Sequence, residues 1–96
     1  YDLQEVAVID GLFIAINKTR ITQNFVKDID SKHMYDIAFC LANLTDKNNK
    51  YKIGVTTNIR IAHNSIGELD ESWYKAREQV NEMFGKFYPI DVTKDK

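Results

Sequence analysis

Cysteine, proline and glycine are scarce in this chain of 96 residues, which has one cysteine, one proline and four glycines. The single cysteine, Cys40, excludes an internal disulfide and any zinc cluster built on several cysteines. The glycines form neither a G-x-G-x-x-G nor a Walker sequence, so no nucleotide-binding loop is indicated. No apolar run comes near the roughly 18 residues of a membrane-spanning helix.

Neither sign of charge is in excess. The chain has 13 Lys and Arg residues against 14 Asp and Glu residues, for a net charge of -1. A chain balanced in this way has no strong field that attracts a polyanion such as nucleic acid. Its 44% of hydrophobic and 28% of charged residues are typical of a globular domain. We therefore expect a single domain over residues 1–90 and a flexible polar tail over residues 91–96.

The clearest periodicity lies in the last third of the chain, where apolar residues recur every three or four positions. This spacing predicts an amphipathic helix over residues 66–87. Ser65 and Glu68 fit a capping box at its start, and Gly85 and Pro89 suit its end. The apolar stripe expected to pack on a sheet consists of Leu69, Trp73, Ala76, Val80, Met83, Phe84 and Phe87.

Three segments before this helix have patterns typical of strands. Residues 51–62 alternate cleanly between apolar and polar side chains, and residues 21–29 alternate more loosely. Residues 35–44 are apolar on both faces, as in the central strand of a sheet. Because short polar loops join the three segments, the sequence predicts a three-stranded antiparallel meander.

The opening segment, residues 2–18, is compatible with two structures. Asp10-Gly11 is a good two-residue turn between apolar runs, which indicates a hairpin. A helix is the alternative, and a three-stranded sheet needs a second helix to close its inner face. We favour the helix. The expected fold is then α+β, a two-layer α-β-β-β-α sandwich with a three-stranded antiparallel meander and both helices packed on one face.

Residues that could carry chemistry match no catalytic or metal-binding motif. His33 and His63 are the only histidines, and their spacing is not that of metal ligands. Asp30 or Asp36 would have to complete such a site, so we predict loop histidines and no metal. Cys40, in the predicted central strand, is expected to be a buried structural thiol with a raised pKa.

The start of the last predicted helix is acidic. Glu68, Asp70 and Glu71 complement the positive end of a helix dipole, which explains them without a paired-carboxylate site. The α-β-β-β-α order is shared with modules that bind double-stranded RNA, but these carboxylates would repel phosphates. We predict no enzymatic activity, no cofactor and no nucleic-acid partner.

The surface expected to contact other proteins is the outer face and edge of the predicted strand 51–62. A long strand with an open edge is suited to strand addition by a protein partner or by a second copy in a homodimer. Tyrosines off the apolar stripe are a second signal, because tyrosine is enriched at interfaces. The candidate interface residues are Lys52, Thr56, Asn58, Arg60, Tyr74 and Tyr88.

One short stretch resembles a known family. The residues Ile59-Arg60-Ile61-Ala62, then Ile66-Gly67-Glu68 and Glu71-Ser72, are similar to an I-R-V-G…F-G-D…S pattern in small bacterial lipoproteins of unknown function. The chain departs from that pattern by Ala62 where glycine is expected and by two extra residues before Gly67. The resemblance implies an envelope location and no known activity. Because the chain begins with Tyr1, we expect a removed leader, whose lipid anchor would be the only membrane contact.

These observations leave three functions open. The first is a non-enzymatic soluble domain of a bacterial envelope protein, a lipoprotein, that acts through protein contacts. The second is a cytosolic or phage-encoded adaptor or inhibitor. The third is a small-ligand-binding module, which requires an apolar cavity with a few convergent polar groups.

Overall fold

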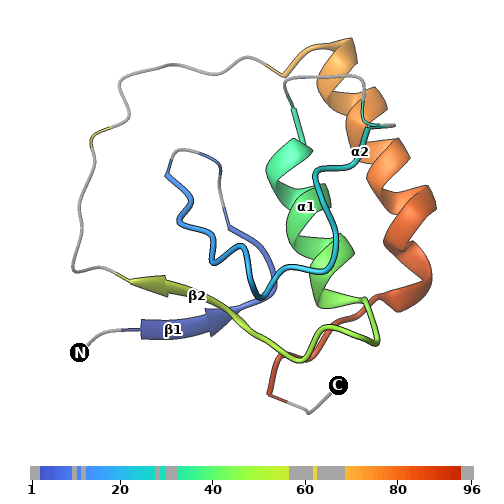
Figure 1. The fold of residues 1–96 in the computed structure, drawn as a ribbon. Helices are drawn as coiled ribbons and strands as arrows, with labels where there is room; N and C mark the ends of the chain where they lie inside the picture. The colour runs from blue at the N-terminus through green and yellow to red at the C-terminus, as the bar shows by residue number, and fades with distance from the viewer. Residues whose placement is uncertain are drawn as a thin grey trace.

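The computed structural model describes residues 3–9, 11, 13–27, 29, 33–56, 62 and 69–93. Its elements are strand β1 (Leu3–Val6), helix α1 (Tyr35–Leu44), strand β2 (Ile53–Thr56), helix α2 (Glu71–Phe84) and the 3-10 helix η1 (Gly85–Phe87). Figure 1 shows the two helices side by side and the small sheet beside them. The predicted α+β class is confirmed, but the α-β-β-β-α order is wrong.

In the described residues, a sheet of two antiparallel strands stands in place of the predicted three-stranded meander. Leu3 of β1 lies opposite Thr56 of β2, and Val6 lies opposite Ile53. Of the three predicted strands, only 51–62 contains strand residues in the part that the structure describes. The described residues of 21–29 have an irregular backbone, and the predicted central strand 35–44 is the helix α1.

Residue preference explains why α1 is a helix. It contains one β-branched residue, Ile37, and several good helix formers, so little in it favours a strand. Its buried residues Ala38 and Leu41 also lie three positions apart, on one helical face. Thr45 closes the helix, because its N–H and its hydroxyl donate to the Leu41 carbonyl at 2.9 and 2.7 Å.

Among the described residues of the opening segment, neither the helix nor the hairpin considered from the sequence is present. After β1, the described residues from 13 to 18 form neither helix nor strand. Gly11 lies in a turn, and its N–H donates to a carboxylate oxygen of Asp36 at 2.6 Å. Asp10 and Leu12, beside that turn, lie outside the described residues. The opening segment therefore contacts α1 through this hydrogen bond and pairs with β2 through its strand β1.

Helix α2 begins later than predicted. Asp70 is its N-cap, and Oδ1 of Asp70 accepts the N–H of Trp73 at 3.1 Å. Leu69 and Asp70 are not helical, so the predicted start at residue 66 is wrong. Ser65 and Glu68, the predicted capping box, lie outside the described residues. One aspartate thus provides the cap that satisfies an orphan backbone donor.

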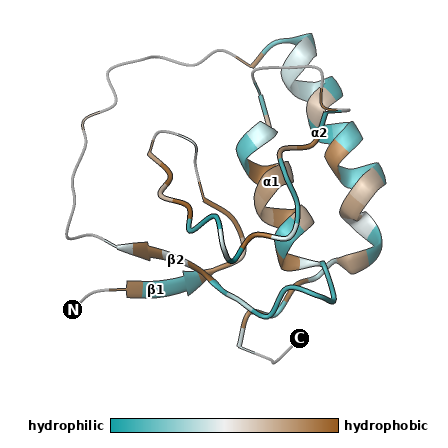
Figure 2. Cartoon of the chain, viewed as in Figure 1, coloured by the Kyte–Doolittle hydropathy of each residue, from teal (hydrophilic) through white to brown (hydrophobic). Residues whose placement is uncertain are grey.

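The hydrophobic core lies between the two helices and not on the sheet. Figure 2 shows the hydrophobic bands of both helices. The buried core residues are Ile29, Ala38, Leu41, Ala76, Val80 and Phe84. Among the described residues, none from β1 or β2 belongs to this core, so the helices do not cover the sheet as a second layer.

The predicted apolar stripe of α2 is buried in its middle and exposed at its ends. Leu69 and Phe87, which lie outside α2, are 60% and 39% exposed. Trp73 is half-buried, and its ring meets the ring of Tyr74 edge-on at 5.0 Å between centroids. Because α2 packs on α1, the predicted position of Trp73 against a sheet is wrong.

The predicted C-terminal tail starts with a small turn. The hydroxyl and the N–H of Thr93 donate to Oδ1 of Asp91 at 2.5 and 2.9 Å. These hydrogen bonds lower the pKa of the Asp91 carboxyl. Residues 94–96 lie outside the described residues.

Candidate functional site

A buried asparagine on α1 holds the irregular segment before that helix. The amide oxygen of Asn43 accepts the N–H of Thr22 at 2.9 Å and the N–H of Gln23 at 3.1 Å. The amide nitrogen of Asn43 donates to the carbonyl of Gln23 at 3.0 Å. These bonds give residues 22–23 the backbone partners that a neighbouring strand would have supplied.

A second buried asparagine extends this network toward β2. Nδ2 of Asn49 donates to Oδ1 of Asn43 at 3.2 Å. Oδ1 of Asn49 accepts the N–H of Tyr51 at 2.9 Å, and its backbone N–H donates to the carbonyl of Asp46 at 3.0 Å. The two asparagines therefore fix two separate segments of the chain against α1.

A cavity lies beside these asparagines, between α1, the start of β2 and residues 14–21. Its volume is about 410 Å³, within the range of roughly 300–1,000 Å³ that small-molecule sites occupy. Most of the wall is hydrophobic. Its main apolar residues are Ile9, Ile14, Ile21, Phe39, Leu44 and Ile53.

Polar groups border the cavity on two sides. On the buried side lie the amides of Asn43 and Asn49 and the thiol of Cys40. On the exposed side lie Arg20 and Lys52. None of the described residues that line the cavity is an aspartate or a glutamate. The cavity therefore combines an apolar wall, buried amides and two cations.

A local turn positions Arg20. Oδ1 of Asn17 accepts the N–H and the hydroxyl of Thr19 at 3.1 and 2.7 Å, and the N–H of Arg20 donates to the Asn17 carbonyl at 2.9 Å. The guanidinium carbon of Arg20 lies 4.7 Å from the centroid of the Tyr51 ring. This cation–π contact holds the guanidinium beside another residue of the cavity wall.

Lys52 reaches across the sheet to β1. Its Nζ atom lies 3.3 Å from Oε1 of Glu5. The Lys52 side chain is 63% exposed, and exposed ion pairs contribute at most about 1 kcal/mol to stability. The chief effect of the pair is that Glu5 offsets part of the charge of Lys52 at the cavity.

Cys40 is buried, as predicted, although it lies on a helix. Burial raises the pKa of its thiol; a hydrogen bond with the backbone of Ile9 opposes the shift, and the nearby Asp36 carboxylate adds to it. The predicted rise in the thiol pKa is therefore confirmed. The thiol is protonated at neutral pH, which makes it a poor nucleophile.

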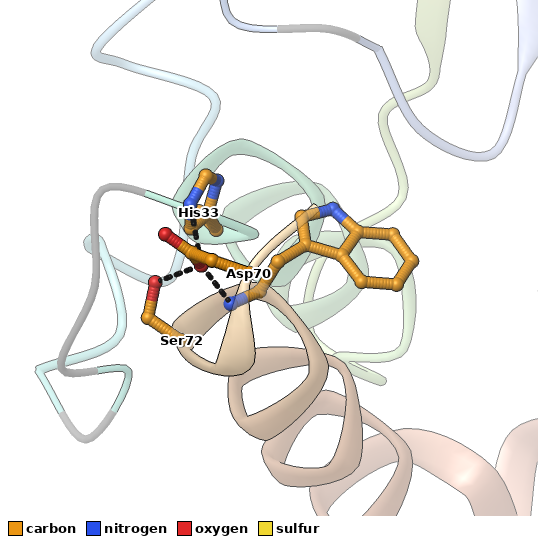
Figure 3. A network of polar contacts seen from close by, with 4 residues as sticks. His33, Asp70 and Ser72 are labelled. Carbon is orange, nitrogen blue, oxygen red and sulfur yellow. Dashed lines mark hydrogen bonds and ion pairs between the residues drawn. The ribbon is translucent and has the colours of Figure 1, made fainter. Parts of the chain in front are cut away.

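Histidine, aspartate and serine meet at the start of α2, as Figure 3 shows. Oδ1 of Asp70 accepts the hydroxyl of Ser72 at 2.6 Å, and Nε2 of His33 lies 3.6 Å from the same oxygen. In a catalytic triad the histidine contacts the serine, whereas here Asp70 lies between them. The cluster caps α2 and connects it to the segment before α1.

The two candidate metal ligands that the structure describes, His33 and Asp36, have different partners. Asp36 accepts the N–H of Gly11, whereas His33 faces Asp70. His63 and Asp30 lie outside the described residues. Within the described ranges, no three His, Cys, Asp or Glu side chains are arranged to hold a metal ion. In the same residues no helix has the length and hydrophobicity needed to cross a bilayer.

The structure describes four of the six predicted interface residues. Lys52 is paired with Glu5, and Thr56 ends β2 opposite Leu3. The two tyrosines, Tyr74 on α2 and Tyr88 after η1, are exposed. The remaining two, Asn58 and Arg60, lie outside the described residues.

Sequence reasoning singled out Cys40 and Lys52 but did not place them at a cavity, and it missed the other residues that build it. Asn43 was the available signal, because a polar side chain within an apolar run must find buried partners. Arg20 carried no signal, since it approaches Tyr51 only in the folded chain.

Comparisons with protein-family models, with curated proteins and with solved structures give no significant match to this chain. The resemblance to envelope lipoproteins therefore stays a prediction. Residues 59–61 and 66–68, which carry most of it, lie outside the described residues.

Proposed function

We propose that this chain is a binding module for a small, largely apolar ligand held in the cavity beside α1. The cavity of about 410 Å³ carries the proposal, since it combines a largely apolar wall with a few polar residues. Sites for small molecules commonly have this composition and this size. This is the third of the functions inferred from the sequence, and it involves no catalysis.

Binding of a neutral apolar fluorophore tests this proposal. N-phenyl-1-naphthylamine is titrated into the wild-type protein, and its gain in fluorescence is recorded. Ala15 is an exposed residue of the cavity wall, so Ala15→Trp places a large ring where it obstructs the cavity. Ala62 is also exposed but does not line the cavity, so Ala62→Trp is the matched control.

We expect saturable binding by the wild type and by Ala62→Trp, with about tenfold weaker binding by Ala15→Trp, equivalent to about 1.4 kcal/mol. Equal affinity in all three proteins would place the fluorophore elsewhere. No saturable binding by the wild type would refute the proposal.

Contact with a protein partner or with a second copy is a second candidate function, favoured by the edges of the sheet. Within the described residues, β1 and β2 pair only with each other, so each has a second edge. Leu3 and Val55, one on each strand, are exposed. The second edge of a two-stranded sheet, with exposed apolar side chains beside it, is suited to strand addition.

A proline in β2 tests this second candidate. Thr56→Pro removes a backbone N–H from the strand, whereas Thr56→Val keeps it and has a similar shape. Association is measured by light scattering, and folding by circular dichroism. Association lost only in a folded Thr56→Pro protein supports strand addition, and unchanged association in that folded protein shows that the Thr56 N–H takes no part in it.

Two hypotheses about the setting of this chain are separate from its binding activity. One is an envelope lipoprotein, and the other is a cytosolic or phage-encoded adaptor or inhibitor. The gene sequence upstream of Tyr1 distinguishes them. A leader that ends in a lipobox cysteine supports the envelope lipoprotein. A start methionine a few codons upstream supports the cytosolic or phage-encoded protein.

A further inference from the structure

The charges around the cavity specify the ligand more closely. Arg20 and Lys52 both line it, and no described lining residue is acidic. Over the whole chain, acidic residues slightly outnumber basic ones, at 14 against 13. The cavity is therefore a local region of positive charge on a chain that is nearly neutral.

We infer that the ligand is a small apolar monocarboxylate, with its apolar body in the cavity and its carboxylate beside Arg20 and Lys52. This inference rests on the proposed function, because it concerns the same site. The two cations are on the exposed side of the cavity, so the ligand's charge remains near water while its hydrocarbon part is buried.

Arg20 is the main recognition group. Its guanidinium is held against the ring of Tyr51, and within the described part of the chain no carboxylate forms an ion pair with it. A guanidinium has parallel N–H donors that match the two oxygens of a carboxylate. Because the turn at residues 17–20 already orders the backbone, the ligand need not fold this segment.

Lys52 contributes less, because Glu5 lies 3.3 Å from its ammonium nitrogen. A ligand carboxylate near Lys52 must share that ammonium with Glu5 and is repelled by Glu5. Removing the charge of Glu5 should therefore strengthen binding, which is a change opposite in sign to the removal of Arg20.

The buried side of the cavity suits the hydrocarbon part of the ligand. The amides of Asn43 and Asn49 are hydrogen-bonded to each other and to the backbone of neighbouring segments. They are therefore engaged within the protein, and the ligand's charged group has its complement only on the exposed side.

Three eight-carbon probes with different head groups test the inference. Octanoate, octanol and octylammonium are each titrated against the complex of the wild-type protein with the neutral fluorophore, and the loss of fluorescence is recorded. All concentrations stay below those at which the probes form micelles. We expect octanoate to bind about fivefold more tightly than octanol, and octylammonium to bind more weakly than both. Added salt should weaken octanoate binding and leave octanol binding nearly unchanged.

Matched variants assign the effect to the cavity. Arg20→Gln should reduce octanoate affinity to that of octanol, and Glu5→Gln should raise octanoate affinity about twofold. Arg77→Gln is the control, because the guanidinium of Arg77 lies 5.4 Å from the Trp73 ring on α2 and does not line the cavity. Circular dichroism confirms that each variant is folded.

The outcomes separate the inference from the proposed function. If the fluorophore binds but octanoate and octanol have equal affinity, or Arg20→Gln and Arg77→Gln weaken octanoate equally, the inference fails and the binding module stands. If the fluorophore does not bind at all, both fail. The head-group comparison and its salt dependence use the wild-type protein alone. They therefore test the carboxylate specificity of the cavity even if a variant does not fold.

Discussion

Oδ1 of Asn43 lies 2.9 Å from the backbone nitrogen of Thr22, and this hydrogen bond joins α1 to a segment that pairs with no strand among the described residues. The same oxygen accepts the N–H of Gln23 and an N–H of Asn49. One side chain therefore holds parts of the chain on both sides of the cavity. The shape of the candidate site depends on this buried amide.

Replacement of Asn43 should destabilise the protein strongly. Asn43→Ala leaves partly buried backbone groups of residues 22 and 23 without these partners, so we expect a loss of about 2 kcal/mol in the free energy of unfolding. Asn48→Ala is the control, because Asn48 is exposed, and it should change that free energy by less than about 0.5 kcal/mol. Urea unfolding measures both. Similar losses in the two variants would show that Asn43 is not the connecting residue.

Cys40 should react slowly with a thiol reagent. The thiol is buried and its pKa is raised, so both access and the thiolate fraction are low at neutral pH. We expect iodoacetamide to label the folded protein at least about tenfold more slowly than the urea-unfolded protein. Intact mass spectrometry follows the reaction. Equal rates would mean that Cys40 is accessible and that the described packing around it is wrong.

The raised pKa of Cys40 also predicts a dependence of stability on pH. As pH rises past the ordinary thiol pKa, near 8.5, the unfolded chain loses the Cys40 proton before the folded chain does. The contribution of this group is thus fully present below that pH and is lost as pH rises toward the folded pKa. Urea midpoints between pH 7 and pH 10 should fall more steeply for the wild type than for Cys40→Ala. Parallel curves for the two proteins would contradict the shift.

The cap of α2 gives a prediction about Asp70. Asp70→Ala removes the acceptor of the Trp73 N–H, so it should cost about 1 kcal/mol of unfolding free energy. Asp70→Asn keeps a side-chain oxygen for the cap but removes the charge that faces His33. It should therefore recover most of that loss. If the alanine and asparagine variants are equally unstable in thermal unfolding, the negative charge of Asp70 matters more than the cap.

The sequence predicted α2 better than α1 for a physical reason. The stripe of α2 has polar residues on its other face, so its period is visible, and Gly85 caps its end as expected. In α1 most residues are apolar, so its sequence fits the two-residue alternation of a strand and the spacing of a helix equally well. The scarcity of β-branched residues, with Ile37 alone in α1, was the signal that favoured the helix.

The sheet and the cavity depend on contacts between distant parts of the chain. β1 forms because Leu3 and Val6 meet Thr56 and Ile53, some fifty residues away, which no local pattern specifies. The alternation of residues 21–29 predicted a strand, but the side chain of Asn43 satisfies part of that backbone instead. A cavity wall assembled from such contacts is invisible to local periodicity.

Methyl NMR of the wild-type protein during titration with octanol tests the central claim, that the cavity beside α1 holds an apolar ligand. The methyl signals of Ile14, Ile21 and Ile53 come from the cavity wall, and the methyl signals of Val80 come from the core between the helices. We predict saturable shifts in the three isoleucines and little change at Val80. Shifts absent from these isoleucines at saturating octanol, or strongest at Val80, would contradict the account.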